Sequence, residues 1–317
     1  MRVTRGIPVA ADSATALTIG NFDGVHLGHQ AMLADLVRAA RERRLPACVM
    51  TFEPHPREFF APDQAPTRLT SLREKLELLA QHGIDRAHVC RFNYELAQIS
   101  AHDFIDRVLV HGLGVRWLLV GDDFRFGARR AGDFITLKQA APRFGFDVKA
   151  MESVILDGER VSSTAVRTAL AAGDLIRAAW LLGRSYSISG RVVRGDGLGR
   201  KLGFATANVQ MKHNRPPLTG IFAVEVTGID ARVLRGAASL GVRPTVKQQG
   251  RPVLEVHLLD FDGELYGRHV RVDFLHKFRD EEKYADLATL TRQIALDVEN
   301  AKAFFNRQDT KNALRQG

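Results

Sequence analysis

The residues best suited to chemistry stand between Thr18 and His29, in the stretch TIGNFDGVHLGH. An apolar run ends at Gly20, and a helix-like pattern begins near His29. A strand that leads through a glycine-rich turn into a helix N-terminus is typical of a phosphate site, because free helix N–H groups and the helix dipole favour an anion there. His26 and His29 flank Gly28, so two imidazoles can reach an anion held at this turn.

Three further segments place polar side chains at expected strand or helix ends. FEPHP (52–56) and GDDFRFG (121–127) each follow an expected strand, and VSSTAVR (161–167) leads into a helix. The Ser-Ser-Thr run is also a good helix N-cap, because Ser and Thr are preferred there. Arg167 lies one turn later, where helical spacing directs it toward an anion at the helix start.

A second glycine-rich stretch, GRVVRGDGLGRKLGFATAN, covers residues 190–208. It completes neither the P-loop pattern nor the GxGxxG pattern of dinucleotide sites. Its backbone N–H groups can still wrap a phosphate. Thr206 and Asn208 then place hard oxygen ligands, which suit Mg²⁺, on one face of a strand. Further along, Glu255 alternates with Leu254 and Val256, so on a strand it points away from these apolar neighbours.

The elements that must position these residues change character along the chain. Strand-like and helix-like runs alternate over 14–150, which predicts a doubly wound parallel sheet with helices on both faces. Ser100 with Asp103 has capping-box spacing, and Gly112 stands just past an expected helix end. The expected strands are 16–20, 47–52, 87–92 and 117–121, and the expected helices are 28–43, 71–82 and 101–111.

The second half of the chain has a different pattern of apolar residues and turns. Two short helices are expected over 162–183, and short β-rich runs separated by Gly, Pro and Asn then predict a small antiparallel barrel. Apolar spacing over 286–305 predicts a closing amphipathic helix. We therefore expect two domains, 1–183 and 184–317. The barrel strands are expected at 188–193, 221–226, 234–240, 254–259 and 270–275.

Composition narrows the class of protein. The chain has 317 residues, enough for two hydrophobic cores, and carries a formal charge of +9, which suits polyanionic ligands such as nucleotide phosphates. The basic residues are scattered rather than grouped in a block. Cys48 and Cys90 each stand in an apolar run and predict neither a disulfide framework nor a zinc cluster. No signal peptide or membrane span is expected, and we expect a cytoplasmic protein.

The motifs of the first half, in their order, resemble the FMN adenylyltransferase module of the bacterial bifunctional riboflavin kinase/FAD synthetase family. His-x-Gly-His at 26–29 is also the mark of the wider nucleotidyltransferase superfamily. The resemblance implies that His26 and His29 stabilise charge during adenylyl transfer. It implies ATP-binding roles for Gly20, Asn21, Phe22, Asp23, Gly28, Ser163, Thr164 and Arg167, and flavin or metal contacts for His55, Asp123 and Phe124.

The second half is similar to the riboflavin kinase part of the same family. Gly-Phe-Pro-Thr-Ala-Asn is the usual core there, and this chain has Ala205 in place of the proline. Ser239 stands where the family commonly has Asn, which weakens any role for this side chain. The resemblance implies that Glu255 is the catalytic base and that KFRDEEKY (277–284) forms a flavin-side flap. It implies metal ligation by Thr206 and Asn208, and ATP binding by Gly195, Gly197, Gly199, Lys201 and Gly203.

The resemblance implies a bifunctional enzyme with Mg²⁺ as cofactor. It would phosphorylate riboflavin to FMN with ATP and then adenylylate FMN to FAD. We expect small-molecule partners and binding to neither nucleic acid nor membrane. Formation of a homo-oligomer is left open. One alternative is another His-x-Gly-His nucleotidyltransferase or a tRNA synthetase-like protein, and a second is a basic RNA-binding protein. A third is a chain in which one module has lost its activity, and the kinase module is the one expected to be weakened.

Overall fold

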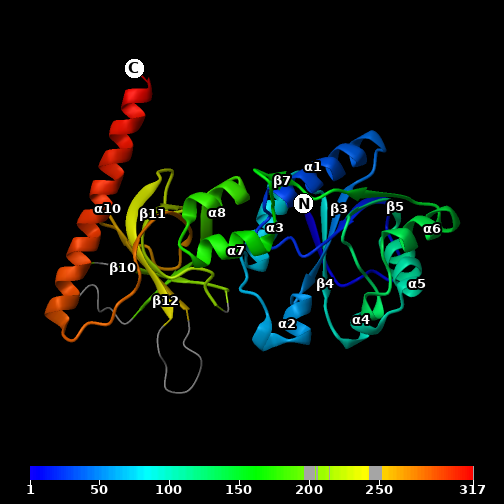
Figure 1. The fold of residues 1–317 in the computed structure, drawn as a ribbon, viewed down its shortest axis with the longest axis horizontal. Coiled ribbons are helices and arrows are strands. Elements are labelled where there is room, and N and C mark those ends of the chain that lie inside the picture. Colours follow the sequence, from blue (N-terminus) through cyan, green and yellow to red (C-terminus); the bar gives the residue numbers. More distant parts are fainter. Residues whose placement is uncertain (196–203, 205, 214, 243–251, 317) are drawn as a thin grey trace. The chain divides into compact units, whose positions relative to one another are not determined.

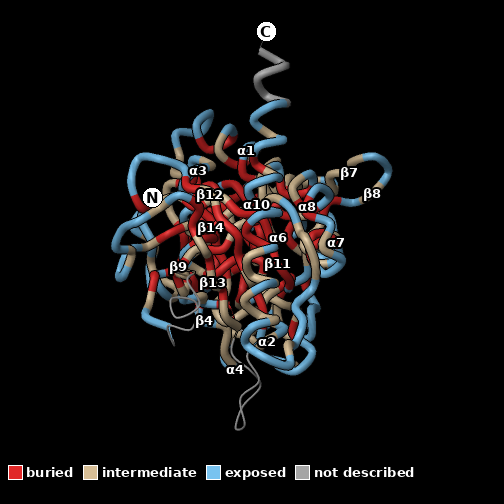
Figure 2. Tube along the Cα trace, turned by 90° about the vertical axis from the view of Figure 1, so that its left-hand side faces the viewer, coloured by how far each residue is buried: buried red, intermediate tan, exposed pale blue. Residues whose placement is uncertain are grey.

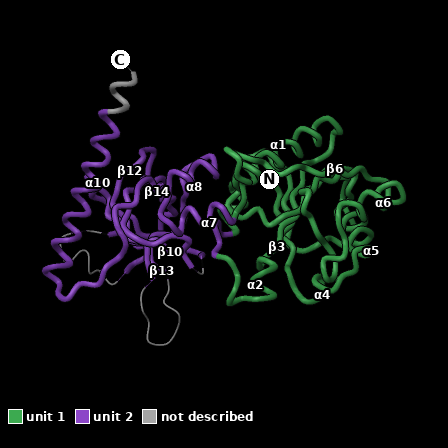
Figure 3. The backbone as a smooth tube through the Cα atoms, in the orientation of Figure 1, with its two compact units in different colours: residues 1–66, 72–163 green, residues 67–71, 164–317 purple. Residues whose placement is uncertain are grey.

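The computed structural model describes residues 1–195, 204, 206–213, 215–242 and 252–316. These residues divide into two compact units (Figure 3). Unit 1 comprises residues 1–66 and 72–163, and unit 2 comprises residues 67–71 and 164–317. The domain boundary expected at residue 184 stays a prediction.

Unit 1 is built on a parallel sheet of six strands in the order β1-β4-β3-β2-β5-β6 (Figure 1). Every neighbouring pair is parallel. Strand β2 is buried along its whole length, as a central strand covered on both faces must be. The strands are β1 (Arg2–Arg5), β2 (Thr15–Ile19), β3 (Ala47–Glu53), β4 (Arg86–Arg91), β5 (Val115–Gly121) and β6 (Asp147–Met151).

Alternate residues of β2 enter two different cores, which confirms the doubly wound sheet. Ala16 packs with Leu33 of α1 (Leu27–Glu42) on one face, together with α3 (Leu72–Gln81). Leu17 packs with Leu109 of η2 (Phe104–Gly112) on the other, together with α6 (Phe134–Phe144). The shorter elements are α2 (Pro56–Phe60), η1 (Pro62–Gln64), α4 (Tyr94–Gln98), α5 (Ala101–Asp103), η3 (Ala128–Arg130), β7 (Ile155–Leu156) and β8 (Glu159–Arg160).

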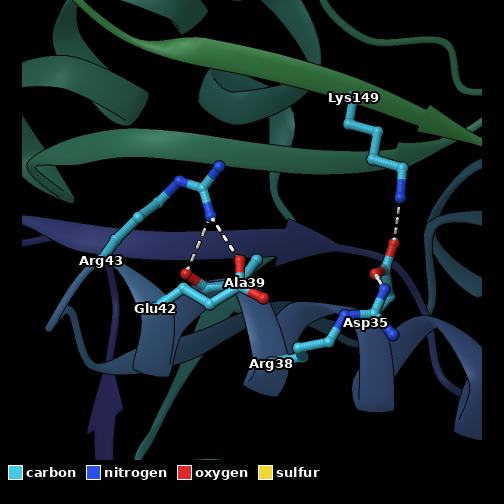
Figure 4. A network of polar contacts seen from close by, with 6 residues as sticks. All are labelled: Asp35, Arg38, Ala39, Glu42, Arg43 and Lys149. Atoms are coloured by element: carbon cyan, nitrogen blue, oxygen red, sulfur yellow. Dashed lines mark hydrogen bonds and ion pairs between the residues drawn. The ribbon is translucent and has the colours of Figure 1, made fainter.

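Helix α1 is also linked by a polar network to β6, the edge strand of the sheet (Figure 4). The Lys149 ammonium of β6 lies 2.7 Å from the Asp35 carboxylate, which also pairs with Arg38. The Arg43 guanidinium donates to the Ala39 carbonyl at 3.1 Å, at the end of the same helix. These contacts join the middle of α1 to β6 and satisfy a backbone carbonyl at the C-terminal end of the helix.

The expected strands and helices of unit 1 are confirmed within one or two residues, with instructive exceptions. Ser100 caps α5 by accepting from the Asp103 N–H at 3.0 Å, as its spacing predicts. The expectation for Gly112 was wrong, because the helix runs through it and Gly114, at φ +61°, makes the turn instead. The segment 104–112 is a π-helix rather than an α-helix. Strands β1 and β6 and helix α6 were not expected.

The two cysteines are buried and free, as their apolar surroundings predict. Burial raises the pKa of the Cys48 and Cys90 thiols to about 12. Both side chains therefore act as small apolar residues of the sheet core.

Unit 2 contains a closed antiparallel barrel in the order β10-β13-β12-β11-β14-β9, which confirms the expected barrel. Leu254 and Phe222 fill its interior, while Ala223 and Ala237 face outward and are covered by Phe305 of the last helix. Buried residues accordingly follow these strands in Figure 2. The elements are α7 (Ser163–Ala171), α8 (Leu175–Leu182), β9 (Tyr186–Val193), β10 (Thr206–Gln210), β11 (Gly220–Thr227), β12 (Leu234–Val242), β13 (Pro252–Leu258), β14 (His269–Arg279) and α10 (Leu287–Gln316).

Candidate active sites

The sheet of unit 1 reverses its winding direction between β2 and β5. The chain leaves β2 toward β3 on one side and leaves β5 toward β6 on the other. Such a reversal opens a crevice at the carboxyl ends of the two strands, where open α/β sheets bind their ligands. A cavity of about 250 Å³ lies at this point. It is lined by the predicted site residues Gly20, Phe22, His26, Gly28, His29, Asp123 and Phe124.

His26 is the N-cap of α1. Its Nδ1 accepts from the His29 backbone N–H at 3.3 Å, so the proton of a neutral ring lies on Nε2, which is then a hydrogen-bond donor. The two imidazoles stack, with ring centroids 3.7 Å apart. Gly28 allows this approach, because a Cβ there would lie 3.2 Å from His26 ring atoms.

His29 is held in its neutral form. Burial lowers its pKa well below the ordinary value, and the nearby His26 and Lys75 charges lower it further. Its buried Nδ1 has no hydrogen-bond partner within the described part of the chain. A neutral imidazole donates through one nitrogen only, so each ring can offer one N–H to an anion.

The turn between β2 and α1 is fixed from several sides. Phe22 has φ +48° and is fully buried, with its ring centroid 5.0 Å from that of His29. The Thr51 hydroxyl donates to the Asn21 carbonyl at 3.3 Å, and the Ser163 hydroxyl donates to the Asp23 carbonyl at 2.9 Å. These contacts make the turn a rigid support for the histidines.

The Ser-Ser-Thr motif is divided between the two units. Ser163, the first residue of α7, reaches the β2–α1 turn within unit 1. Thr164 and Arg167 belong to unit 2, where the Arg167 Nε donates to the Thr67 carbonyl at 2.6 Å. Triphosphate contacts by Thr164 and Arg167 stay predictions.

The three residues expected to contact flavin or metal have different surroundings. His55 does not line the cavity; it caps α2, where its Nδ1 accepts from the Arg57 N–H at 3.1 Å. Asp123 does line the cavity and pairs with Arg160, whose guanidinium lies 2.7 Å away. This hydrogen bond raises the pKa of Arg160. Phe124 stacks on Phe126, with ring centroids 5.6 Å apart.

Two features of unit 1 were missed by reasoning from sequence. Arg160 lines the cavity although it was not singled out; its place immediately before the VSST run was the available signal. An aromatic cluster follows β3 and β4, where the rings of Phe59, Phe60 and Phe92 lie 5.3–5.5 Å apart. Phe60 is 66% exposed, which is unusual for a large apolar side chain.

The register of the barrel brings the predicted kinase residues together. Asn208 of β10 pairs directly with Glu255 of β13, and Thr206 pairs with His257. Directly opposed residues of an antiparallel pair point to one face, with Cβ atoms about 4.5–5.5 Å apart. The proposed base and the proposed metal ligands therefore share the outer face of the barrel.

Part of the glycine-rich stretch lies next to these residues. Gly195 packs against the Asn208 side-chain amide so closely that a Cβ at residue 195 would overlap it. This contact brings the start of the stretch beside a predicted metal ligand. Gly197, Gly199, Lys201 and Gly203, as well as Ala205, lie outside the described residues.

Among the described residues, no group of three or more His, Cys, Asp or Glu side chains is placed to hold a metal ion. The neutral oxygens of Thr206 and Asn208 instead suit a cation that brings most of its ligands with it, as Mg²⁺ bound to nucleotide phosphates does. No helix in the described part of the chain is long and apolar enough to cross a membrane.

Comparison with known proteins covers both units. Residues 9–165 match the FAD synthetase family, and residues 182–305 match the riboflavin kinase family. The chain is 49% identical over 308 residues to the bifunctional riboflavin kinase/FMN adenylyltransferase of Escherichia coli K12, covering 96% of this chain and 98% of that one. It is 52% identical over 286 residues to the protein of that name from Pseudomonas fluorescens, covering 90% and 91%.

A solved structure has a similar fold. It is described as a macrolide-efflux protein from Streptococcus pneumoniae and aligns with a TM-score of 0.79 at 26% identity, covering 94% of this chain and 97% of that one. The likeness extends over both units. Taken with the family matches and the high-identity relatives, it leads to one conclusion: this chain belongs to the family of bifunctional riboflavin kinase/FMN adenylyltransferases.

Proposed function

We propose that this chain makes FAD in two steps at two separate sites. Unit 2 phosphorylates riboflavin to FMN with ATP, and unit 1 adenylylates FMN with a second ATP and releases pyrophosphate. One observation carries the proposal: each unit holds its own set of groups for phosphate chemistry. These are the stacked His26–His29 pair in unit 1 and the paired Asn208 and Glu255 in unit 2.

In unit 1 the ATP phosphates bind at the N-terminus of α1. An FMN phosphate oxygen attacks the α-phosphorus while the bond to the leaving pyrophosphate oxygen breaks, and the electron pair leaves with the pyrophosphate. Such a transfer needs positioning and charge stabilisation rather than an enzyme nucleophile. The His26 and His29 N–H groups donate to phosphate oxygens. The hydrogen bond accepted by His26 Nδ1 leaves Nε2 as the donor of that ring, and burial, which lowers the pKa of His29, keeps one donor on the His29 ring.

Beside this centre, Arg160 supplies a further contact to the triphosphate. Asp123 holds the Arg160 guanidinium in the cavity wall through its 2.7 Å ion pair. The exposed rings of Phe59 and Phe60, which meet edge to face, offer an apolar surface to the flavin ring of FMN.

In unit 2 Glu255 accepts the proton of the riboflavin 5′-hydroxyl as that oxygen attacks the γ-phosphorus of ATP and ADP leaves. Thr206 and Asn208 are the residues that would hold Mg²⁺ together with the ATP phosphates. When bound, the ion neutralises phosphate charge. The close packing of Gly195 on Asn208 supports this assignment, because it fixes a metal ligand beside the start of the phosphate-binding stretch.

The substrates are small molecules, and no nucleic acid is part of the proposed reactions. Both cysteines are free. We infer that the enzyme works in the cytoplasm, where thiols stay reduced.

The proposal is tested by incubating the purified chain with riboflavin, ATP and Mg²⁺ and separating the flavins by chromatography. FMN should appear first and FAD after it, with pyrophosphate forming in step with FAD. Chelation of Mg²⁺ should stop FMN formation. Absence of both FMN and FAD would contradict the proposal, and FMN without FAD would restrict it to unit 2.

A further inference from the structure

Unit 1 has a second cavity, at the opposite edge of its sheet from the cavity that holds the His26–His29 pair. This second cavity has a volume of about 180 Å³. It is lined by Thr15, the first residue of β2, whereas Ile19, the last residue of β2, lines the cavity at the histidines. Four steps along an extended strand separate these two residues by about 13 Å. The second cavity is therefore distinct from the proposed adenylylation site.

Strand register gathers four polar side chains at this cavity. In the parallel ladder between β1 and β4, Arg2 pairs with Arg86 and Thr4 pairs with His88. Alternate residues of a strand point to the same face, so the four side chains form two adjacent pairs on one face of the sheet. All four line the cavity, together with Asp12 of the loop between β1 and β2.

The charged groups of the cavity favour an anion. The Asp12 carboxylate accepts from the Arg2 guanidinium at 2.9 Å through one oxygen and from the Arg86 guanidinium through the other. Within the described part of the chain, each guanidinium donates from a single nitrogen, so most of its five N–H groups are left for a ligand or for water. Two positive charges thus stand against one negative charge, and hydrogen-bond donors outnumber acceptors.

His88 adds a donor that is almost fully enclosed. Its side chain lines the cavity, and the residue is only 6% exposed. Its Nδ1 lies 2.7 Å from the Thr4 hydroxyl, whereas Nε2 makes no hydrogen bond with any of the described residues. Buried polar atoms normally have a partner, so a ligand in this cavity would satisfy Nε2.

The charges around His88 hold its ring neutral. Burial lowers the pKa of His88, and the Arg86 and Arg2 charges lower it further against the smaller opposing effect of Asp12. A neutral ring has one N–H, and the Thr4 hydroxyl can donate to Nδ1. In that tautomer Nε2 carries the proton and can donate it in a hydrogen bond to an anion.

We propose that this cavity binds a small phosphate-type anion through the Arg2 and Arg86 guanidinium groups and the His88 Nε2–H. Donors from two neighbouring strands suit a tetrahedral oxyanion, whose oxygens point in several directions, better than a carboxylate, whose two oxygens lie in one plane. Hydrogen bonds from Arg to phosphate are also among the strong polar contacts, because both partners are charged. The site is independent of the two reactions proposed above.

The test titrates the whole chain with inorganic phosphate, at constant pH and ionic strength, and follows the histidine ring signals by NMR. The His88 signals, identified by their loss in His88→Gln, should shift saturably, while the His26 and His29 signals report separately on the adenylylation site. Arg86→Gln should weaken binding at His88 about 10- to 100-fold, the range expected for hydrogen bonds to a charged group. Asp12→Asn should strengthen it about 5-fold or more, because a negative charge next to the anion is removed.

Arg5→Gln is the matched control. Arg5 stands on β1 but points to the opposite face from Arg2 and Thr4, and it does not line the cavity. This variant should bind phosphate as the wild type does. If Arg86→Gln does not fold, Arg2→Gln decides by the same comparison, because the Arg2 side chain is the more exposed of the two.

Two further anions define the ligand. Acetate, with one charge and two oxygens, should bind about 10-fold more weakly than phosphate. Binding of methyl phosphate as well as inorganic phosphate would assign the site to a phosphoryl group carried by a larger molecule, and binding of inorganic phosphate alone would assign it to the free ion. The proposal is overturned if the His88 signals do not shift saturably, if acetate binds as tightly as phosphate, or if Asp12→Asn binds no more tightly than the wild type.

Discussion

At the scale of single residues, the two histidines of unit 1 serve the fold and the proposed chemistry together. His26 caps α1 through Nδ1, and the same hydrogen bond leaves the proton on Nε2. The Nε2 N–H can therefore donate a hydrogen bond to a phosphate oxygen. His29 is buried against the His26 ring and Phe22, and this burial keeps it neutral. Capping and burial are therefore the means by which the fold prepares two donors.

The lowered pKa of His29 makes a prediction about pH. Its ordinary pKa is restored on unfolding, so below about pH 6.5 the unfolded chain binds a proton that the folded chain does not. The free energy of unfolding should then fall as the pH decreases below 6.5, by up to about 1.4 kcal/mol per pH unit from this group. His29→Gln should remove this part of the slope in denaturant titrations. An NMR signal of His29 that titrates near pH 6.5 in the folded protein would contradict the assignment.

The sequence could predict most of these residues by type but not their roles in detail. His26, Gly28 and His29 were found because a glycine-rich strand–helix turn has a recognisable spacing. Arg160 was missed because its place in the cavity wall depends on the hairpin after β6. The Phe59–Phe60 pair was missed because its cluster with Phe92 joins the segments that follow β3 and β4. Such contacts join segments far apart in the chain, and no local pattern encodes them.

At the scale of elements, each proposed site depends on one glycine that permits a close approach. Gly28 lies under the His26 ring at the start of α1, and Gly195 lies against the Asn208 amide after β9. Strands and helices with clear periodicity were predicted well. The exceptions are the strands β1 and β6, which are short and partly exposed, the helix α6, and η2, whose π-helical turn has the same apolar spacing as an α-helix.

The two glycines give a paired prediction. Gly28→Ala should fold, since Ala favours a helix, but its Cβ would displace the His26 ring and reduce adenylylation about 10- to 100-fold. Gly195→Ala should displace Asn208 and reduce FMN formation by a similar factor. Each variant should keep the other activity, measured with riboflavin or with supplied FMN. Loss of the same activity in both variants would contradict the assignment of the sites.

The ion pair between Arg279 and Asp297 gives a prediction about the barrel. Asp297→Ala leaves a largely buried guanidinium without its carboxylate, which should cost about 3–5 kcal/mol. For the unfolding transition that removes kinase activity, the free energy of unfolding should fall by that amount. The midpoint of this transition should therefore move to a lower denaturant concentration. The double variant Arg279→Met/Asp297→Leu, which removes both charges, should recover most of the loss. A single variant as stable as wild type would show that the pair contributes nothing to holding α10.

At the scale of the whole molecule, the chain joins two phosphate-transfer units whose reactions follow one another. The order of motifs predicted both fold classes, because parallel and antiparallel architectures differ in the spacing of their strands and helices. The assignment of some residues to one unit or the other was not predictable in the same way. Residues 67–71 belong to the second unit because of contacts with residues distant in sequence. The positive charge of the chain suits substrates that carry phosphate at both sites.

Independence of the two sites is the central claim, and a complementation experiment tests it most directly. With riboflavin, ATP and Mg²⁺, His29→Ala should accumulate FMN, and Glu255→Gln should leave riboflavin unchanged while still converting supplied FMN to FAD. A mixture of the two variants should make FAD from riboflavin, because FMN released by one is adenylylated by the other. If either folded variant loses both activities, or if the mixture makes no FAD, the two-site account is wrong.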